Sequence, residues 1–145
     1  MTTATIRTSE RAHPSATLDA VIPFVGRALL TAIFLFSVVG KLQAPAGTIG
    51  YIASAGLPFP QVGYALAVLI ELVGGLALLV GYRTRIAAGA LALFSLAAAF
   101  GFHNNLADLN QFIHFFKNVA IAGGLLQVVA FGAGGFSLDA YRREK

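Results

Sequence analysis

The 145-residue sequence contains no cysteine and no tryptophan, and only 11% of its residues are charged. Without cysteine the chain has no disulfide, no CxxC redox motif, no thiolate nucleophile and no cysteine ligand for zinc or an iron–sulfur cluster. Soluble domains carry about 25% charged residues. Here 57% of the residues are hydrophobic and the mean hydropathy is +0.78. A chain of this size cannot bury so much apolar surface within itself, so the composition predicts that lipid is its solvent.

The net charge of +4 is the one feature that suggests nucleic acid as a partner. A nucleic-acid-binding domain gathers its basic residues on one face or along one helix. Here they are scattered along the chain, which membrane orientation explains better. We therefore expect the lipid bilayer, and no nucleic acid, as a partner.

Four apolar stretches predict an all-α fold, a four-helix transmembrane bundle, with spans at about 20–40, 61–81, 86–102 and 111–132. A helix of about 20 residues crosses a hydrocarbon core of roughly 30 Å. Residues 41–60 are too broken by glycine and proline to span. Because Pro45 can start a helix and Gly56 can end one, they predict a short interfacial helix instead. The flanks are polar, so residues 1–19 are predicted to be a disordered tail, 20–136 the membrane domain and 137–145 a second tail.

Helical spacing assigns faces to the second and third spans. In the second, Ala67, Glu71, Gly75 and Leu78 share one side with other small residues, and the opposite side is leucine-rich and suits lipid. Glu71 is therefore expected to point into the bundle. The third span presents an alanine-rich face suited to close helix contact. These small-residue faces fit packing within one bundle or between copies, so the oligomeric state stays open.

Basic residues also predict the orientation. With four spans, one side of the membrane receives Arg7, Arg11, Arg83, Arg85, Arg142, Arg143 and Lys145. The other side clearly receives Lys41 alone. Cytoplasmic loops are enriched in lysine and arginine, so both termini are predicted to be cytosolic.

Glu71 is the lone carboxylate near the middle of a span, and it needs a partner or a function. Counted from the span ends at 1.5 Å per residue, it lies about 5 Å from Arg27 along the membrane normal. Lys117, in the fourth span, is the other cation within reach, although Arg27 is the first choice. The pair is interpreted either as a structural ion pair that fixes helix register or as a proton-carrying or quinone head-group site.

His114, Lys117 and Asn118 share one face at the start of the fourth span and continue the polar surface towards Glu71. A snorkelling lysine beside a hydrogen-bonding asparagine explains this face equally well. His103 and His114 flank the outer loop without a metal-binding pattern, so no metal site is predicted. Six phenylalanines can line a quinone pocket or simply pack against lipid: Phe34, Phe36, Phe94, Phe100, Phe115 and Phe116.

Taken together, several segments resemble the DoxX family of small four-helix membrane proteins. They are RALLTAIFLFSVVGKL (27–42), AGLPFP (55–60), ELVGGLALLVGYRTR (71–85), FFKNVAIAGGLL (115–126) and FGAGGFSLD (131–139). The resemblance implies an integral protein of the bacterial cytoplasmic membrane. It also implies a link to oxidoreductase assemblies, because family names derive from subunits of a thiosulfate:quinone oxidoreductase.

The leading functional hypothesis is therefore a membrane subunit of an oxidoreductase assembly that works near the quinone pool. Arg27, Glu71, His114, Lys117 and Asn118 are its candidate polar cluster. No catalytic residue and no intrinsic cofactor is predicted, so electrons would move through quinone or a soluble oxidoreductase partner on the cytosolic side. The alternative is a non-catalytic scaffold or small-molecule carrier that recruits a soluble enzyme through its basic hairpin and tail.

Overall fold

The computed structural model describes residues 15–145 and confirms the predicted fold class. Its six helices are α1 (Ser15–Gln43), α2 (Pro45–Ser54), α3 (Pro60–Val80), α4 (Thr84–Phe102), α5 (Leu109–Phe131) and α6 (Leu138–Tyr141). Four of them, α1, α3, α4 and α5, are long and apolar enough to cross a membrane. Helix α2 is the short helix expected between the first two spans. Of the predicted N-terminal tail, residues 1–14 lie outside the described part and Ser15–Asp19 form the start of α1.

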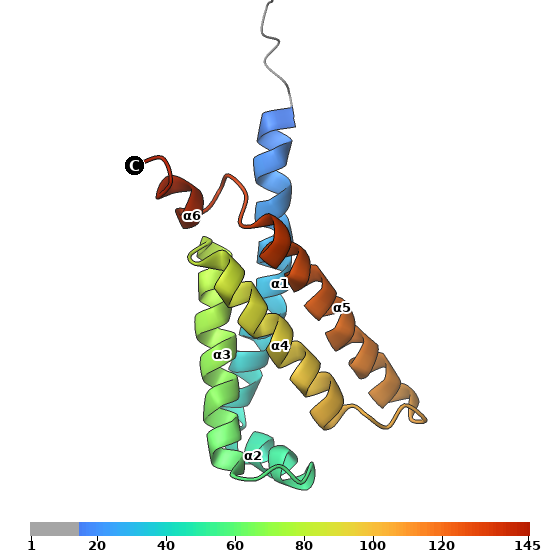
Figure 1. The fold of residues 1–145 in the computed structure, drawn as a ribbon. Coiled ribbons are helices and arrows are strands. Elements are labelled where there is room, and N and C mark those ends of the chain that lie inside the picture. The colour runs from blue at the N-terminus through green and yellow to red at the C-terminus, as the bar shows by residue number, and fades with distance from the viewer. Residues whose placement is uncertain (1–14) are drawn as a thin grey trace, which may run out of the picture.

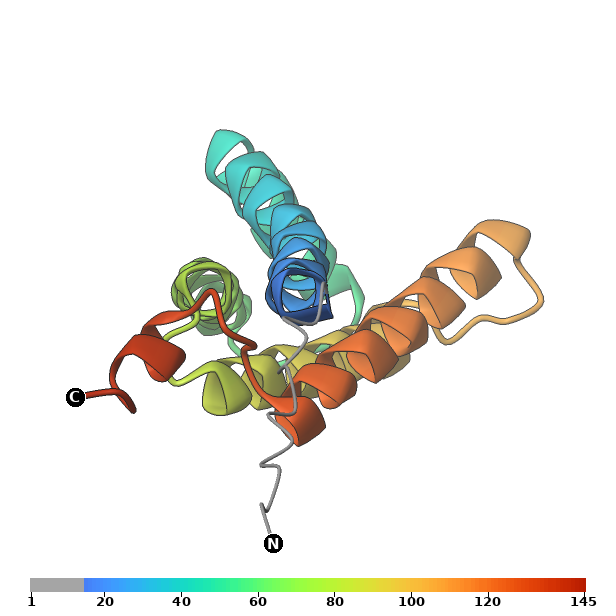
Figure 2. The ribbon, with the colours of Figure 1, turned by 90° about the horizontal axis from the view of Figure 1, so that it is seen from above.

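The spanning helices pack as two neighbouring pairs, α1 with α3 and α4 with α5, joined by contact between α3 and α4 (Figure 1). Helices α1 and α5 touch only sparsely. They are close at one end and diverge towards the other, as the view from above shows (Figure 2). We call the end with the α3–α4 hairpin and α6 the closed end, and the end with α2 the open end.

The packing follows the faces read from the sequence. Ala67, Glu71, Gly75 and Leu78 are the buried residues of α3, and the alanine-rich side of α4 is buried throughout. Leu69, Leu72, Leu76 and Val80 are all exposed on the outside of the bundle. Since apolar side chains on the outer surface of a spanning helix meet lipid rather than water, this exposure is expected.

Helices α1 and α3 are antiparallel and share a steady register. Thr31 of α1 donates to the Gly75 carbonyl at 3.3 Å, and nearer the open end the Tyr64 hydroxyl donates to the Lys41 carbonyl at 3.4 Å. Each step along α1 is thus matched by an equal step back along α3. Gly75 permits this approach, because a Cβ there would lie 3.3 Å from Leu35.

At the closed end, Arg27 connects α1 to the end of α3 and to the segment before α6. Its side chain is 1% exposed, and it donates to the carbonyls of Leu78 (2.8 Å), Leu79 (3.1 Å) and Phe136 (2.5 Å). The last carbonyls of a helix have no partner within that helix, so a guanidinium beside them satisfies groups that would otherwise be unpaired. Gly81, with φ of 72°, leaves room for this contact, because a Cβ there would lie 2.7 Å from the guanidinium.

The C-terminal segment, predicted as a polar tail, includes the short helix α6, which docks on the α3–α4 hairpin. The Asp139 carboxylate accepts hydrogen bonds from the backbone N–H groups of Arg83 and Thr84, both at 2.8 Å, and from the Thr84 hydroxyl at 2.7 Å. Burial raises the pKa of Asp139, but these hydrogen bonds outweigh it and hold the pKa below its ordinary value. Asp139 therefore serves as an N-terminal cap for α4, supplied from outside that helix.

Candidate functional site

A cleft of about 710 Å³ occupies the open end, between the diverging halves of the bundle. Every helix except α6 contributes to its lining, and most of the wall is apolar: Phe34 from α1, Ile52 from α2, Ala67 from α3, Phe94 from α4 and Ile121 from α5. Polar side chains are interspersed on these walls: Ser37, Lys41, Thr48, Tyr51, Glu71, Ser95, His103, His114, Lys117 and Asn118. An apolar cavity with a few convergent polar groups is the usual form of a small-molecule site.

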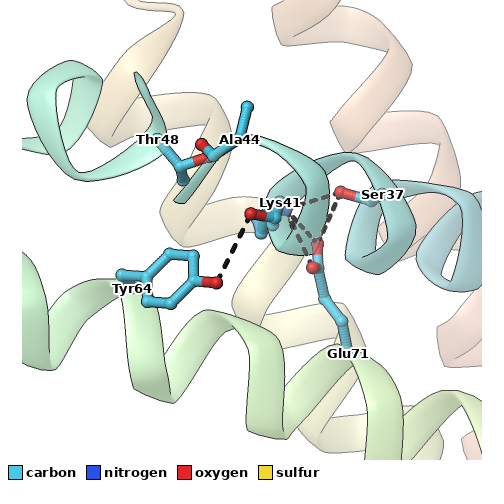
Figure 3. A network of polar contacts seen from close by, with 6 residues as sticks. All are labelled: Ser37, Lys41, Ala44, Thr48, Tyr64 and Glu71. Carbon is cyan, nitrogen blue, oxygen red and sulfur yellow. Dashed lines mark hydrogen bonds and ion pairs between the residues drawn. The ribbon is translucent and has the colours of Figure 1, made fainter. Parts of the chain in front are cut away.

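The first polar group in the cleft joins α1 to α3 (Figure 3). The Lys41 ammonium lies 2.8 Å from Oε2 and 3.1 Å from Oε1 of Glu71, and it also donates to the Ser37 hydroxyl at 2.5 Å. Ser37 in turn donates to Oε1 of Glu71 at 3.0 Å. The Glu71 side chain is 4% exposed and the Lys41 side chain 19%. The carboxylate is therefore fully paired, and the ammonium lies at the edge of the cleft.

This pairing corrects the choice of Arg27 as the partner of Glu71. In the α1–α3 register Arg27 lies level with Leu78, seven residues beyond Glu71, which is about 10 Å along a helix. The sequence estimate placed the end of α1 near residue 40 and left Lys41 in a loop, whereas α1 continues to Gln43. Helical side chains lean towards the N-terminus, so the Lys41 side chain points back along α1 towards Glu71.

The second polar group belongs to α5 and the end of α4. Lys117 contacts Nδ1 of His114 at 2.8 Å, so it does not pair with Glu71, the other partner considered. The Asn118 amide donates to the His114 carbonyl at 3.0 Å. The His103 ring stacks on the His114 ring, with centroids 5.0 Å apart, and its Nδ1 contacts Oε1 of Gln111 at 3.0 Å.

These contacts indicate which tautomer each imidazole adopts in its neutral form. An ammonium can only donate, so Nδ1 of neutral His114 accepts from Lys117 and its proton resides on Nε2. The amide oxygen of Gln111 can only accept, so the proton of neutral His103 resides on Nδ1 and leaves Nε2 as an acceptor. In their neutral forms the two stacked rings therefore offer one donor, Nε2 of His114, and one acceptor, Nε2 of His103.

Four of the five residues in the predicted cluster, all except Arg27, line one cleft. Lys41, Ser37 and His103 belong to the same cleft but were not placed in that cluster. One signal for the α1 pair was present, because Ser37 and Lys41 are four residues apart and lie on one helix face. Of the six phenylalanines, Phe34 and Phe94 line the cleft, while Phe36, Phe100 and Phe116 are exposed on the outside. Residues 15–145 hold no group of three or more metal-ligating side chains.

The four apolar helices and the lipid-exposed leucines define a multi-pass integral membrane protein. The DoxX family model matches residues 22–104, more than half of the chain, so the protein belongs to the DoxX family. It is 37% identical to the inner membrane protein YqjF of Escherichia coli over 88% of this chain and 97% of that protein. It is 32% identical to the inner membrane protein YphA of the same organism, over 82% and 89% respectively. No solved structure matches this chain.

Proposed function

We propose that the open-end cleft binds the head group of a quinone and that the protein is a membrane subunit of an oxidoreductase assembly at the quinone pool. The observation that carries the proposal is the cleft itself, an apolar cavity between spanning helices with polar groups on opposing walls. Its volume, about 710 Å³, lies in the range of small-molecule sites, roughly 300–1,000 Å³. A ligand from the bilayer can approach where α1 and α5 diverge.

The polar groups match both redox forms of such a ligand. A quinone carbonyl needs donors, and Lys117 and Nε2 of His114 supply them. A quinol hydroxyl needs an acceptor, which Nε2 of His103 supplies. The Lys41 ammonium already donates its hydrogen bonds to Ser37 and Glu71. We therefore propose that the Lys41–Glu71 pair shapes the wall of the cleft and does not bind the ligand directly.

The remainder of the proposal concerns partners and orientation. Interconversion of quinone and quinol moves two electrons and two protons. We assign the electrons to an oxidoreductase partner that reaches the quinone at the open end, rather than at the cytosolic side expected from the sequence, and the protons to exchange with water at that end. Basic residues gather at the closed end, in the α3–α4 hairpin and beyond α6. The enrichment of lysine and arginine on cytoplasmic surfaces favours a cytosolic closed end in a bacterial inner membrane.

The test is binding of a short-chain quinone to the purified full chain in detergent, followed by the shift in melting temperature. We expect a concentration-dependent rise for the native chain and about a tenfold weaker response for Lys117→Met, since it removes a charge-assisted donor. Arg143→Gln removes the same charge at the closed end and should respond as the native chain does. No shift in any variant would contradict the quinone proposal.

A further inference from the structure

A second, smaller hollow of about 230 Å³ lies at the closed end, where α4 begins and α5 ends. Arg83, Arg85 and Arg143 line it, together with Asp139 and Gly132. Arg85 lies against the backbone of Gly132, where a Cβ would be 3.6 Å from its Nε atom. This hollow is separate from the quinone proposal, because it shares no lining residue with the open-end cleft.

The arginines outnumber the carboxylate, and the carboxylate is already engaged. Asp139 accepts three hydrogen bonds from the first residues of α4. Within residues 15–145, neither Arg85 nor Arg143 makes an ion pair of the kind that joins Lys41 to Glu71. The charge of Arg143 acts on Asp139 and helps to lower the pKa of that carboxyl, but three arginines share the hollow with this single carboxylate. The site therefore carries an excess of positive charge.

The neighbouring basic residues are arranged differently. The Arg142 guanidinium lies over the Tyr82 ring, 4.8 Å from its centroid, and the Lys145 ammonium lies 4.7 Å from the centroid of Tyr141. These cation–π contacts occupy both groups away from the hollow. Of these basic residues, three arginines line the hollow, and Arg142 and Lys145 lie on aromatic rings outside it.

Ile86, which lines the hollow, is a large exposed apolar side chain, and Phe131 and Phe136 are two more close in sequence to the lining residues Gly132 and Ala133. Ile86 is 66% exposed, Phe131 81% and Phe136 55%. Because α4 begins at Thr84 and α5 ends at Phe131, Ile86 and Phe131 lie at the closed-end termini of two helices that are long and apolar enough to span a membrane. A ligand that fits must carry a compact anion at one end and hydrocarbon at the other.

We infer that this hollow binds the phosphate of an anionic phospholipid, with Arg85 and Arg143 on the phosphate and the acyl chains along α4 and α5. Guanidinium groups bind phosphate oxygens through paired, charge-assisted hydrogen bonds. Basic pockets between spanning helices are known to select anionic lipid head groups. The site would fix the C-terminal segment to the membrane surface through a bound lipid.

The experiment compares two double variants with the same change in net charge. The full chain is purified in mild detergent, titrated with phosphatidylglycerol, and its bound lipid is counted by native mass spectrometry. We expect Arg85→Gln/Arg143→Gln to lower lipid affinity at least tenfold and Arg142→Gln/Lys145→Gln to lower it less than twofold. Arg85→Lys/Arg143→Lys keeps the charge but loses the paired geometry, so an intermediate loss is expected.

Three results would overturn the inference. Equal losses in the two glutamine variants would mean a diffuse charge effect rather than a site. Equal retention of phosphatidylcholine and phosphatidylglycerol by the native chain would show no selection for an anion. Binding of inorganic phosphate as tight as that of the lipid would make the ligand a free anion. If the Arg85→Gln/Arg143→Gln chain does not fold, unchanged lipid affinity in the lysine variant decides against the site.

Discussion

The two ends of the bundle satisfy their polar groups in opposite ways. At the closed end, Arg27 and Asp139 are bonded mainly to backbone groups of other segments, so each ties distant parts of the chain together. At the open end, Lys41, Glu71, His114 and Lys117 are bonded to other side chains and line a cleft. Charged side chains in this protein therefore have two uses. At the closed end the charged groups tie segments of the chain together, whereas at the open end a buried ion pair shapes the wall of a cleft that His114 and Lys117 also line.

The largest effect should follow from Arg27→Gln at the closed end. The variant removes the charged donor that three carbonyl oxygens share. Leaving a buried acceptor unpaired costs roughly 1–3 kcal/mol. We expect the free energy of unfolding in detergent to fall by about 3 kcal/mol or more. Arg27→Lys should recover only part of the lost stability, because one ammonium cannot reproduce the planar arrangement of N–H donors on a guanidinium. Native-like stability in Arg27→Gln would contradict the role of Arg27 in holding the closed end together.

The next effect concerns the partner of Glu71. Removing one member of a buried ion pair leaves the other uncompensated, so Glu71→Gln should lower stability by about 2–4 kcal/mol. A double-mutant cycle with Lys41→Met should show a coupling energy of roughly 1–3 kcal/mol, while a cycle with Arg27→Gln should be additive within about 0.5 kcal/mol. Strong coupling to Arg27 instead would restore the pairing that the sequence suggested.

At Asp139 we expect a smaller effect on stability, and one that depends on pH. Since its pKa in the folded protein is below its ordinary value of 3.8, its contribution is present at neutral pH and is lost as pH falls through the folded pKa. Replacing a helix cap by alanine typically costs about 1 kcal/mol, so Asp139→Ala should lower the free energy of unfolding by about that much at pH 7. Hydrogen exchange of the backbone amides of residues 137–145 measures how stably this segment docks on the α3–α4 hairpin. The native chain should lose protection below about pH 4, and protection that stays constant there would contradict the assignment.

The smallest effect on stability is expected at the open end. Lys117→Met removes a charge that contacts one histidine at the edge of the cleft. The free energy of unfolding should change by less than about 0.5 kcal/mol. A loss as large as that of Arg27→Gln would show that Lys117 holds the fold and does not serve a ligand.

Most of the architecture could be predicted from the sequence, because lipid imposes simple rules on length and periodicity. Apolar runs located the four spans, and the 3.6-residue period placed Glu71, Gly75 and Leu78 inside. Pro45 marked the start of α2. These features depend on local sequence alone, and local sequence is sufficient for them.

The site could be predicted only in part, since its contacts depend on where helices end and how they are shifted. Helix α1 extends a few residues beyond the predicted span, and this places Lys41 in the helix and within reach of Glu71. The stacking of His103 on His114 depends on how the loop between α4 and α5 returns the chain. The role of Asp139 as a cap for α4 spans more than fifty residues of sequence. No periodic pattern carries such information.

The central claim is that the open end, and not the closed end, receives a quinone. The most direct measurement is photo-crosslinking of the purified chain with an azido-quinone, followed by mass spectrometry of the labelled peptides. Label should appear on residues 33–48 of α1 and α2 and on residues 114–121 of α5, and unlabelled quinone should compete for it. Label spread evenly over lipid-facing residues, or concentrated at the closed end, would contradict the claim.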